Sequence, residues 1–102
     1  MRLSPNTILA QHPAVAWRVV EGCAIALQPP SPKGSPQLLT FNDTGTIIWN
    51  LLDGRTSVEA MLARLAEWYP QTPREQQRIE TYALLERLLA AGVVIPQEET
   101  AP

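Results

Sequence analysis

The chain has 102 residues, 45% of them hydrophobic, which is the size and composition of one globular domain with its own core. Its formal net charge is −2 with acids and bases interspersed, which argues against a surface that binds nucleic acid or an anionic membrane through bulk charge. A single cysteine, Cys23, excludes an internal disulfide framework and a cysteine-based metal cluster. The first residues lack the apolar run of a signal peptide, and no stretch is long enough to cross a bilayer, so we expect a cytoplasmic protein without a membrane partner.

The N-terminal part of the chain predicts a flexible lead-in followed by a β-hairpin. Residues 1–13 contain two prolines and no clear periodic pattern, which is typical of a loosely ordered segment. Side chains alternate with period two in residues 15–20 and again in residues 23–27, and Gly22 lies in the short turn between them. In the second run Cys23 shares a face with the larger apolar residues, so we interpret it as a small core residue and not as a reactive thiol.

A third strand, QLLTF, is predicted at residues 37–41 after a proline-rich connection. Residues 28–36 contain four prolines, which excludes regular structure there. In a three-stranded meander the third strand lies at the sheet edge, and such edges are usually protected by charge, proline or bulges. QLLTF carries no charge, so this edge is open to an added strand unless the proline-rich loop or a second copy of the chain covers it. A proline at Leu39 would then be expected to disrupt such pairing.

The first helix is predicted directly after this strand, where the apolar spacing becomes helical. Asn42 or Asp43 can accept a hydrogen bond as its N-cap, and the helix runs to about Leu52. Gly54 fits the left-handed stop that commonly follows a helix.

Two further helices follow, each predicted from a capping box. TSVE at residues 56–59, with its threonine as the cap, predicts a second helix that ends before Pro70. TPRE at residues 72–75 predicts a third helix that begins with proline at its first position and runs to about Ala91. Gly92 is the expected stop of this third helix.

Three strands followed by three helices predict an α+β domain over residues 14–95, a winged helix-turn-helix-like arrangement of a three-stranded antiparallel sheet and three helices. Residues 93–95 form a short extended end to this domain. Residues 96–102, PQEETAP, are expected to be a disordered tail.

The residues that could support catalysis are few, and each has a structural explanation. His12 is the only histidine and has no evident partner. The carboxylates Asp43, Asp53 and Glu59 lie at predicted helix starts and turns, where they stabilise the backbone. The sequence contains no phosphate-binding glycine motif and no HExxH zinc motif. We therefore expect a protein that is not an enzyme and has no cofactor and no metal site.

The third predicted helix has a wider apolar arc than a helix packed on one side needs. Its core stripe consists of Ile79, Tyr82, Leu85 and Leu89. Leu84 and Leu88 extend the arc, with Gln77 and Thr81 in the same flank. Two interpretations stay open: a central helix packed on two sides, or a helix whose leucines line a groove for a partner.

A winged helix-turn-helix arrangement would also suit a DNA-binding regulator, which is the alternative function. The charged residues of the third helix are Arg74, Arg78 and Arg87 against Glu75, Glu80 and Glu86. Their charges sum to zero, whereas phosphate contacts supply most of the affinity for DNA. We therefore expect no nucleic-acid partner.

The segment FNDTGTIIWNLLDGRTSVEAMLARLAEWYP at residues 41–70, with LLERLLAAGVV at residues 84–94, resembles the PqqD-like family. These are the precursor-peptide recognition domains of pathways for ribosomally made, post-translationally modified peptides. The resemblance implies three antiparallel strands packed on three helices. It also implies that the leader segment of a precursor adds as a strand beside the third strand and lies against the third helix.

Carried onto this sequence, the resemblance implies a peptide-binding site on two elements. The strand supplies Gln37, Leu38, Leu39, Thr40 and Phe41, and the helix supplies Arg74, Gln77, Arg78, Thr81, Leu84, Leu85 and Leu88. The connection at residues 28–36 is longer and richer in proline than is usual in the family, so it bears on how much of the edge is open.

The resemblance further implies a peptide chaperone of the standalone type, which hands the leader to a maturation enzyme in trans. A leader peptidase, a cyclase or a radical SAM enzyme would fit, and so would a lasso-peptide pathway. A structural subunit permanently bound to one enzyme is another hypothesis, and the open edge also allows a strand-paired homodimer.

Overall fold

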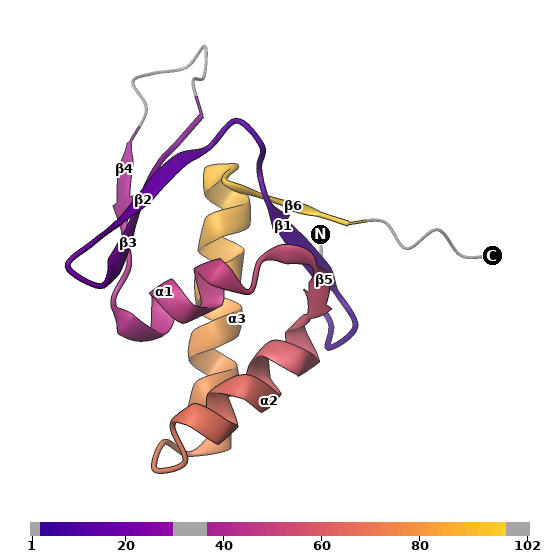
Figure 1. Ribbon diagram of the computed structural model, residues 1–102. Coiled ribbons are helices and arrows are strands. Elements are labelled where there is room, and N and C mark those ends of the chain that lie inside the picture. Colours follow the sequence, from indigo (N-terminus) through magenta and orange to yellow (C-terminus); the bar gives the residue numbers. More distant parts are fainter. Residues whose placement is uncertain (1–2, 30–36, 98–102) are drawn as a thin grey trace.

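The computed structural model describes residues 3–29 and 37–97 (Figure 1). Within these residues the chain forms an α+β fold of three helices and two three-stranded antiparallel sheets. The elements in chain order are β1 (Ile8–Gln11), β2 (Ala16–Val20), β3 (Cys23–Leu27), β4 (Leu38–Thr40), α1 (Asp43–Asn50), β5 (Asp53–Ser57), α2 (Val58–Trp68), α3 (Arg74–Ala91) and β6 (Val94–Pro96). The α+β class and the three helices agree with the sequence analysis, whereas the winged helix-turn-helix label stays a prediction.

The predicted meander is confirmed as the sheet β2-β3-β4, with β4 at one edge. Its hairpin turn contains Glu21 and Gly22, both with positive φ (53° and 84°), which is the backbone that joins twisted antiparallel strands through two residues. The proline-rich connection to β4 falls largely on residues 30–36, which lie outside the described residues.

The predicted core face of β3 is wrong. Ala24 and Ala26 are fully buried, while Cys23 is only half-buried on the opposite face. The reason is the space that the indole of Trp49 occupies: α1 packs on β3, and Trp49 lies 5.9 Å from Trp17, the strand partner of Ala26, with their rings at 81°. Only small side chains fit on the part of β3 that faces these rings.

The second sheet, in the order β5-β1-β6, was not predicted. The expected flexible lead-in is wrong for Ile8–Gln11, because these residues form the central strand and the Leu9 side chain is fully buried. The Gln11 side-chain amide also donates to the Trp49 carbonyl (2.9 Å), which ties the strand to α1. Pro96, assigned to the predicted tail, pairs with Leu9 at the end of β6, and residues 98–102 lie outside the described residues.

The cap of α1 is as predicted, but its end is not. The Asn42 side chain accepts a hydrogen bond from the Gly45 N–H (2.7 Å), which identifies Asn42 as the N-cap. The helix ends at Asn50, with Leu51 as its C-cap, before the predicted Leu52. Gly54 does adopt positive φ (79°), but it does so within β5 and not as a helix stop.

Both predicted capping boxes are wrong in detail. Ser57, and not Thr56, caps α2 by accepting from the Ala60 N–H (3.1 Å), because the Thr56 hydroxyl instead donates to Asp53 (3.1 Å). No side-chain hydrogen bond caps α3, which begins after Pro73. The end of α3 is as predicted, since Gly92 lies in the left-handed region with φ of 74°.

We predict that Ser57→Ala lowers the free energy of unfolding by about 1 kcal/mol, because the Ala60 N–H loses its acceptor at the start of α2. Urea denaturation followed by circular dichroism measures this loss. Ser57→Asp is the control and should retain most of the stability, because aspartate also accepts at an N-cap. Equal midpoints for Ser57→Ala and the parent chain would contradict the assignment of this cap.

Helix α3 lies between the two sheets (Figure 1) and contributes a buried stripe to the core. Leu85 and Leu88 are buried, as are Gln77 and Thr81. Ile79, predicted in the core stripe, is 58% exposed, because the stripe that packs inward is centred on the flank that holds Leu88. No helix in the described part of the chain is both long and apolar enough to cross a membrane.

Candidate functional site

The free edge of β4 is the first part of the candidate site. At the two ends of this strand, the Gln37 carbonyl accepts from Gln28 (2.9 Å) and the Phe41 N–H donates toward β3 (3.0 Å). Backbone groups alternate in direction along a strand, so Leu39 also pairs toward β3, where it lies opposite Ala26. Leu38 and Thr40 therefore direct two N–H and two C=O groups away from the sheet, and no described strand pairs with them.

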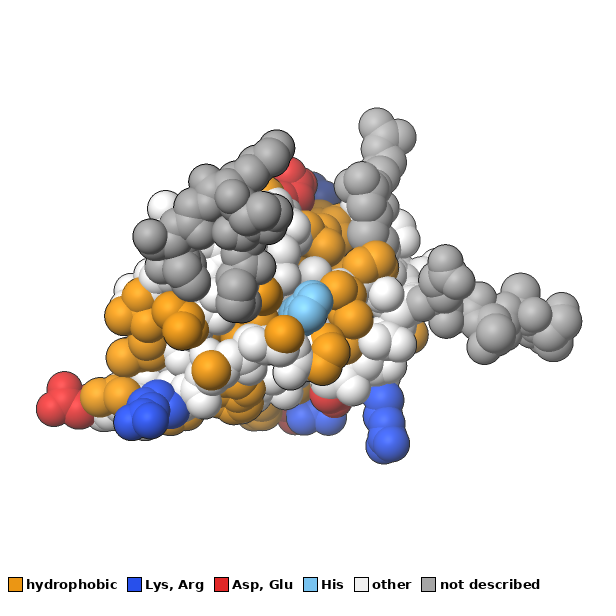
Figure 2. Space-filling view, turned by 90° about the horizontal axis from the view of Figure 1, so that it is seen from above, with side chains coloured by type: hydrophobic (Ala, Val, Ile, Leu, Met, Phe, Trp, Pro, Cys, Tyr) orange, Lys and Arg blue, Asp and Glu red, His pale blue; other side chains and the backbone are white. Residues whose placement is uncertain are grey.

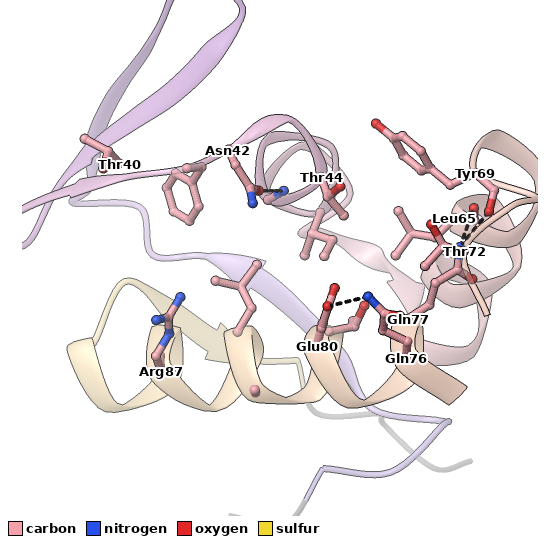
Figure 3. A pocket seen from close by; sticks show the side chains of 16 residues that line it. Thr40, Asn42, Thr44, Leu65, Tyr69, Thr72, Gln76, Gln77, Glu80 and Arg87 are labelled. Atoms are coloured by element: carbon pink, nitrogen blue, oxygen red, sulfur yellow. Dashed lines mark hydrogen bonds between the residues drawn. The ribbon is translucent and has the colours of Figure 1, made fainter. Parts of the chain in front are cut away.

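A groove of about 860 Å³ begins where β4 ends (Figure 3). It runs between α3 on one side and the start of α1 and the end of α2 on the other. Its lining residues are Thr40, Phe41, Asn42, Thr44, Gly45, Ile48, Leu65, Tyr69, Thr72, Gln76, Gln77, Glu80, Thr81, Ala83, Leu84 and Arg87. A groove of this volume can take several residues of an extended peptide.

The apolar part of the groove is supported by the aromatic core. Phe41 contributes to the lining and stacks on Trp49, with ring centroids 5.2 Å apart and planes at 27°. Ile48, Leu65 and Leu84 add aliphatic surface. Because Phe41 contacts both the groove and Trp49, tryptophan fluorescence is expected to change when a ligand enters the groove.

Gln77 fixes the wall of the groove at the end of α2. Its side chain is 6% exposed, and its amide donates to the carbonyls of Leu65 and Tyr69, both at 3.1 Å. The Leu65 carbonyl also accepts from the Tyr69 N–H (2.8 Å) and the Tyr69 carbonyl from the Thr72 N–H (3.1 Å), so the amide of Gln77 adds a second hydrogen bond to each. Gln77 therefore holds α3 and α2 together, and its amide protons are already used within the protein.

The charged side chains that line the groove are Glu80 and Arg87, both on α3. Figure 3 shows them on the same wall, with Arg87 toward Thr40 and Glu80 nearer Gln76, whose amide donates to it (3.0 Å). In contrast, Arg78 lies outside the groove and donates to Glu75 (2.6 Å), a pairing that raises the pKa of Arg78.

The structure brings together only part of the site implied by the resemblance. Thr40 and Phe41 from the strand meet Gln77, Thr81 and Leu84 from α3 in the groove. The remaining implied residues lie elsewhere: Gln37, Leu38 and Leu39 along β4, Arg74 and Arg78 outside the groove, and Leu85 and Leu88 in the core.

The wall opposite α3 was not predicted from the sequence. This wall consists of Asn42, Thr44, Gly45 and Ile48 from α1 and of Leu65, Tyr69 and Thr72 at the end of α2. The α1 residues of this wall could have been predicted from the sequence, because they directly follow the edge strand in the chain. Nothing local in the sequence indicates that the end of α2 faces the start of α1.

The candidate catalytic residues His12 and Cys23 make local contacts in the described part of the chain. His12 Nδ1 accepts from the N–H of Ala14 (3.0 Å), within its own turn. Desolvation and the nearby carboxylate of Asp43 raise the pKa of Cys23. Among residues 3–29 and 37–97, no three potential metal ligands lie close enough together to hold an ion.

An α+β domain whose unpaired strand edge leads into a partly apolar groove belongs to the class of domains that can receive an extended peptide. The family model described as coenzyme PQQ synthesis protein D (PqqD) matches residues 23–94, well over half of the chain. The chain therefore belongs to the PqqD family, a family of precursor-peptide recognition elements. Searches among curated proteins and among solved structures found no match. The matched range runs from β3 into β6 and contains every residue that lines the groove.

Proposed function

We propose that this protein binds the leader segment of a ribosomally synthesised precursor and delivers it to a maturation enzyme without catalysing a reaction itself. The leader pairs as a fourth strand with β4 and continues into the groove along α3. The observation that carries this proposal is the free edge of β4: its outward backbone groups at Leu38 and Thr40 lead toward the groove, which Thr40 itself lines.

The expected affinity follows from the groups that the edge and the groove offer. Four edge hydrogen bonds contribute about 1 kcal/mol each, and two buried leader side chains add about 3 to 6 kcal/mol. Ordering the peptide costs about 2 to 5 kcal/mol, and the loss of free motion on association costs several more. At the favourable end these terms leave about 4 kcal/mol, so these groups alone account for a dissociation constant of about 1 mM, and tighter binding requires further contacts along the groove.

Titration with the leader peptide encoded beside this gene tests the proposal directly. Saturable binding with a change in tryptophan fluorescence is expected, because Phe41 links the groove to Trp49. Isothermal titration calorimetry gives the affinity independently of the fluorophore. The absence of saturable binding in both measurements would contradict the proposed function.

Delivery requires a second surface, and we assign it to the outer face of the sheet β2-β3-β4. Val20, Leu27 and Leu38 are 44%, 42% and 61% exposed, although all three are large apolar residues. Figure 2 shows hydrophobic side chains gathered on the side of the molecule that this sheet forms. An enzyme docked on this face would lie beside the leader without blocking the groove. A leader peptidase, a cyclase or a radical SAM enzyme could occupy it, in a lasso-peptide or another pathway.

The double substitution Val20→Lys with Leu27→Lys is expected to abolish docking to the maturation enzyme encoded nearby, because two buried charges would replace apolar contacts. Leader affinity should change less than about twofold, since neither side chain lines the groove. Co-purification with the enzyme and calorimetry with the leader measure the two effects separately. The exposed pair Arg55→Ala with Glu59→Ala is the control. Retained docking by the lysine variant would exclude this face.

A further inference from the structure

The α3 wall of the groove presents three kinds of chemistry in a fixed order. Figure 3 shows the cation Arg87 at the end near β4 and the anion Glu80 farther along the helix. The aliphatic Leu84, which also lines the groove, lies between them in the sequence of α3. These residues follow one another at helical spacings of three and four, so they share one face of α3. At 1.5 Å per residue, the steps between them along the helix axis are about 4.5 and 6 Å.

The two charges are left available to a ligand. Both side chains belong to exposed residues, and within the described residues Arg87 has no ion pair or hydrogen bond. Glu80 accepts a single hydrogen bond, from the neutral amide of Gln76, which leaves its negative charge uncompensated. Elsewhere on the same helix Arg78 and Glu75 pair with each other, and Arg74 and Glu86 do not line the groove, so Arg87 and Glu80 are the charges of α3 that a ligand in the groove meets.

An extended peptide matches this spacing. Alternate residues of a strand point to the same side and lie about 6.6 Å apart. Three alternate side chains of one strand therefore fall close to Arg87, Leu84 and Glu80 in turn, and the length of the charged side chains covers the small difference.

We propose, resting on the function proposed above, that the leader carries a charged pair of opposite sign around an apolar residue. An acidic side chain meets Arg87, an apolar side chain covers Leu84, and a basic side chain meets Glu80, each separated by one residue. Antiparallel pairing with β4 is the more stable arrangement. In this arrangement the leader motif, read from its N-terminal end, is basic, any, apolar, any, acidic. The leader segment that pairs with Leu38 and Thr40 follows this motif.

Selection from a displayed library of random peptides tests this motif with the full chain. The parent protein is expected to enrich the order basic, any, apolar, any, acidic. The variant Glu80→Lys with Arg87→Glu should enrich the reverse order of charges. The matched control is Arg64→Glu with Glu67→Lys, which reverses two exposed charges on α2 outside the groove and should enrich the parent motif.

Each pairing is expected to change affinity by about 1.5- to 5-fold at low ionic strength. A selected peptide with its two charges exchanged should therefore bind the parent chain more weakly and the Glu80→Lys, Arg87→Glu variant more tightly. The difference should shrink as salt is added, because exposed charges are screened.

The outcomes separate this inference from the proposed function. Enriched peptides that lose binding to Thr40→Pro but show no charge order would overturn the motif and retain strand addition at β4. A motif of the opposite direction, acidic before basic, would overturn the antiparallel assignment. Failure to enrich any peptide would contradict the proposed function together with the inference.

Discussion

Thr40→Pro is expected to weaken leader binding at least about tenfold while the domain stays folded. The Thr40 N–H points away from β3, so proline at this position removes a donor from the free edge and leaves the pairing of β4 with β3 in place. The lost hydrogen bond is worth about 1 kcal/mol, and the proline ring also displaces a strand that approaches this edge. Calorimetry with the leader measures the loss, and circular dichroism verifies the fold.

Two controls make this result specific to the edge. Thr40→Val keeps the backbone donor and is expected to bind the leader within about twofold of the parent chain. Leu39→Pro, the substitution that the sequence alone suggests, removes an N–H that faces β3 and should instead destabilise the sheet. Leader affinity that is unaffected by Thr40→Pro would show that the peptide does not pair with β4.

Trp49→Ala is expected to lower the free energy of unfolding by about 3 to 5 kcal/mol. The Trp49 side chain is fully buried, stacks on Phe41 at 5.2 Å and lies edge to face with Trp17 at 5.9 Å. Its indole N–H has no partner among the described residues, so the loss comes from packing and from the cavity left behind. A domain of this size has a stability of about 5 to 15 kcal/mol, and the variant should therefore be marginal.

The effect is measured by urea denaturation, with Trp49→Phe as the control. Phenylalanine keeps a ring beside Phe41 and should restore a large part of the stability. Leader affinity is expected to fall with Trp49→Ala even where the protein is folded, because Phe41 loses the ring that holds it against the groove. A loss of stability below about 1 kcal/mol would contradict the central position of Trp49 in the core.

The sequence predicted those elements whose signals are local. The hairpin around Gly22, the cap at Asn42 and the stop at Gly92 each depend on neighbouring residues, and all three are present in the structure. Strand β1 was missed because its partners β5 and β6 lie more than 40 residues away in the sequence. No turn signal or capping residue near Leu9 indicates that it occupies the centre of a sheet.

The second feature that the sequence did not predict correctly is which apolar side chains face the core. Hydrophobicity favoured Cys23 for the core face of β3 and Ile79 for that of α3, yet both face outward more than their neighbours. The core face of β3 is decided by the size of Trp49, because only side chains as small as alanine fit beside its indole. For α3, the hydrogen bonds of Gln77 to the end of α2 fix how the helix is rotated.

The sequence by itself determined the family, the α+β class and the uncharged edge strand, because a capped helix next to an alternating strand leaves a local signature in the order of residues. Only the tertiary structure decided which backbone groups of β4 face outward. It also placed Arg87, Leu84 and Glu80 in line beside these groups. The physical reason is that a groove exists between elements: its shape and charge depend on how α3 is rotated against α1 and α2, and long-range packing sets that rotation.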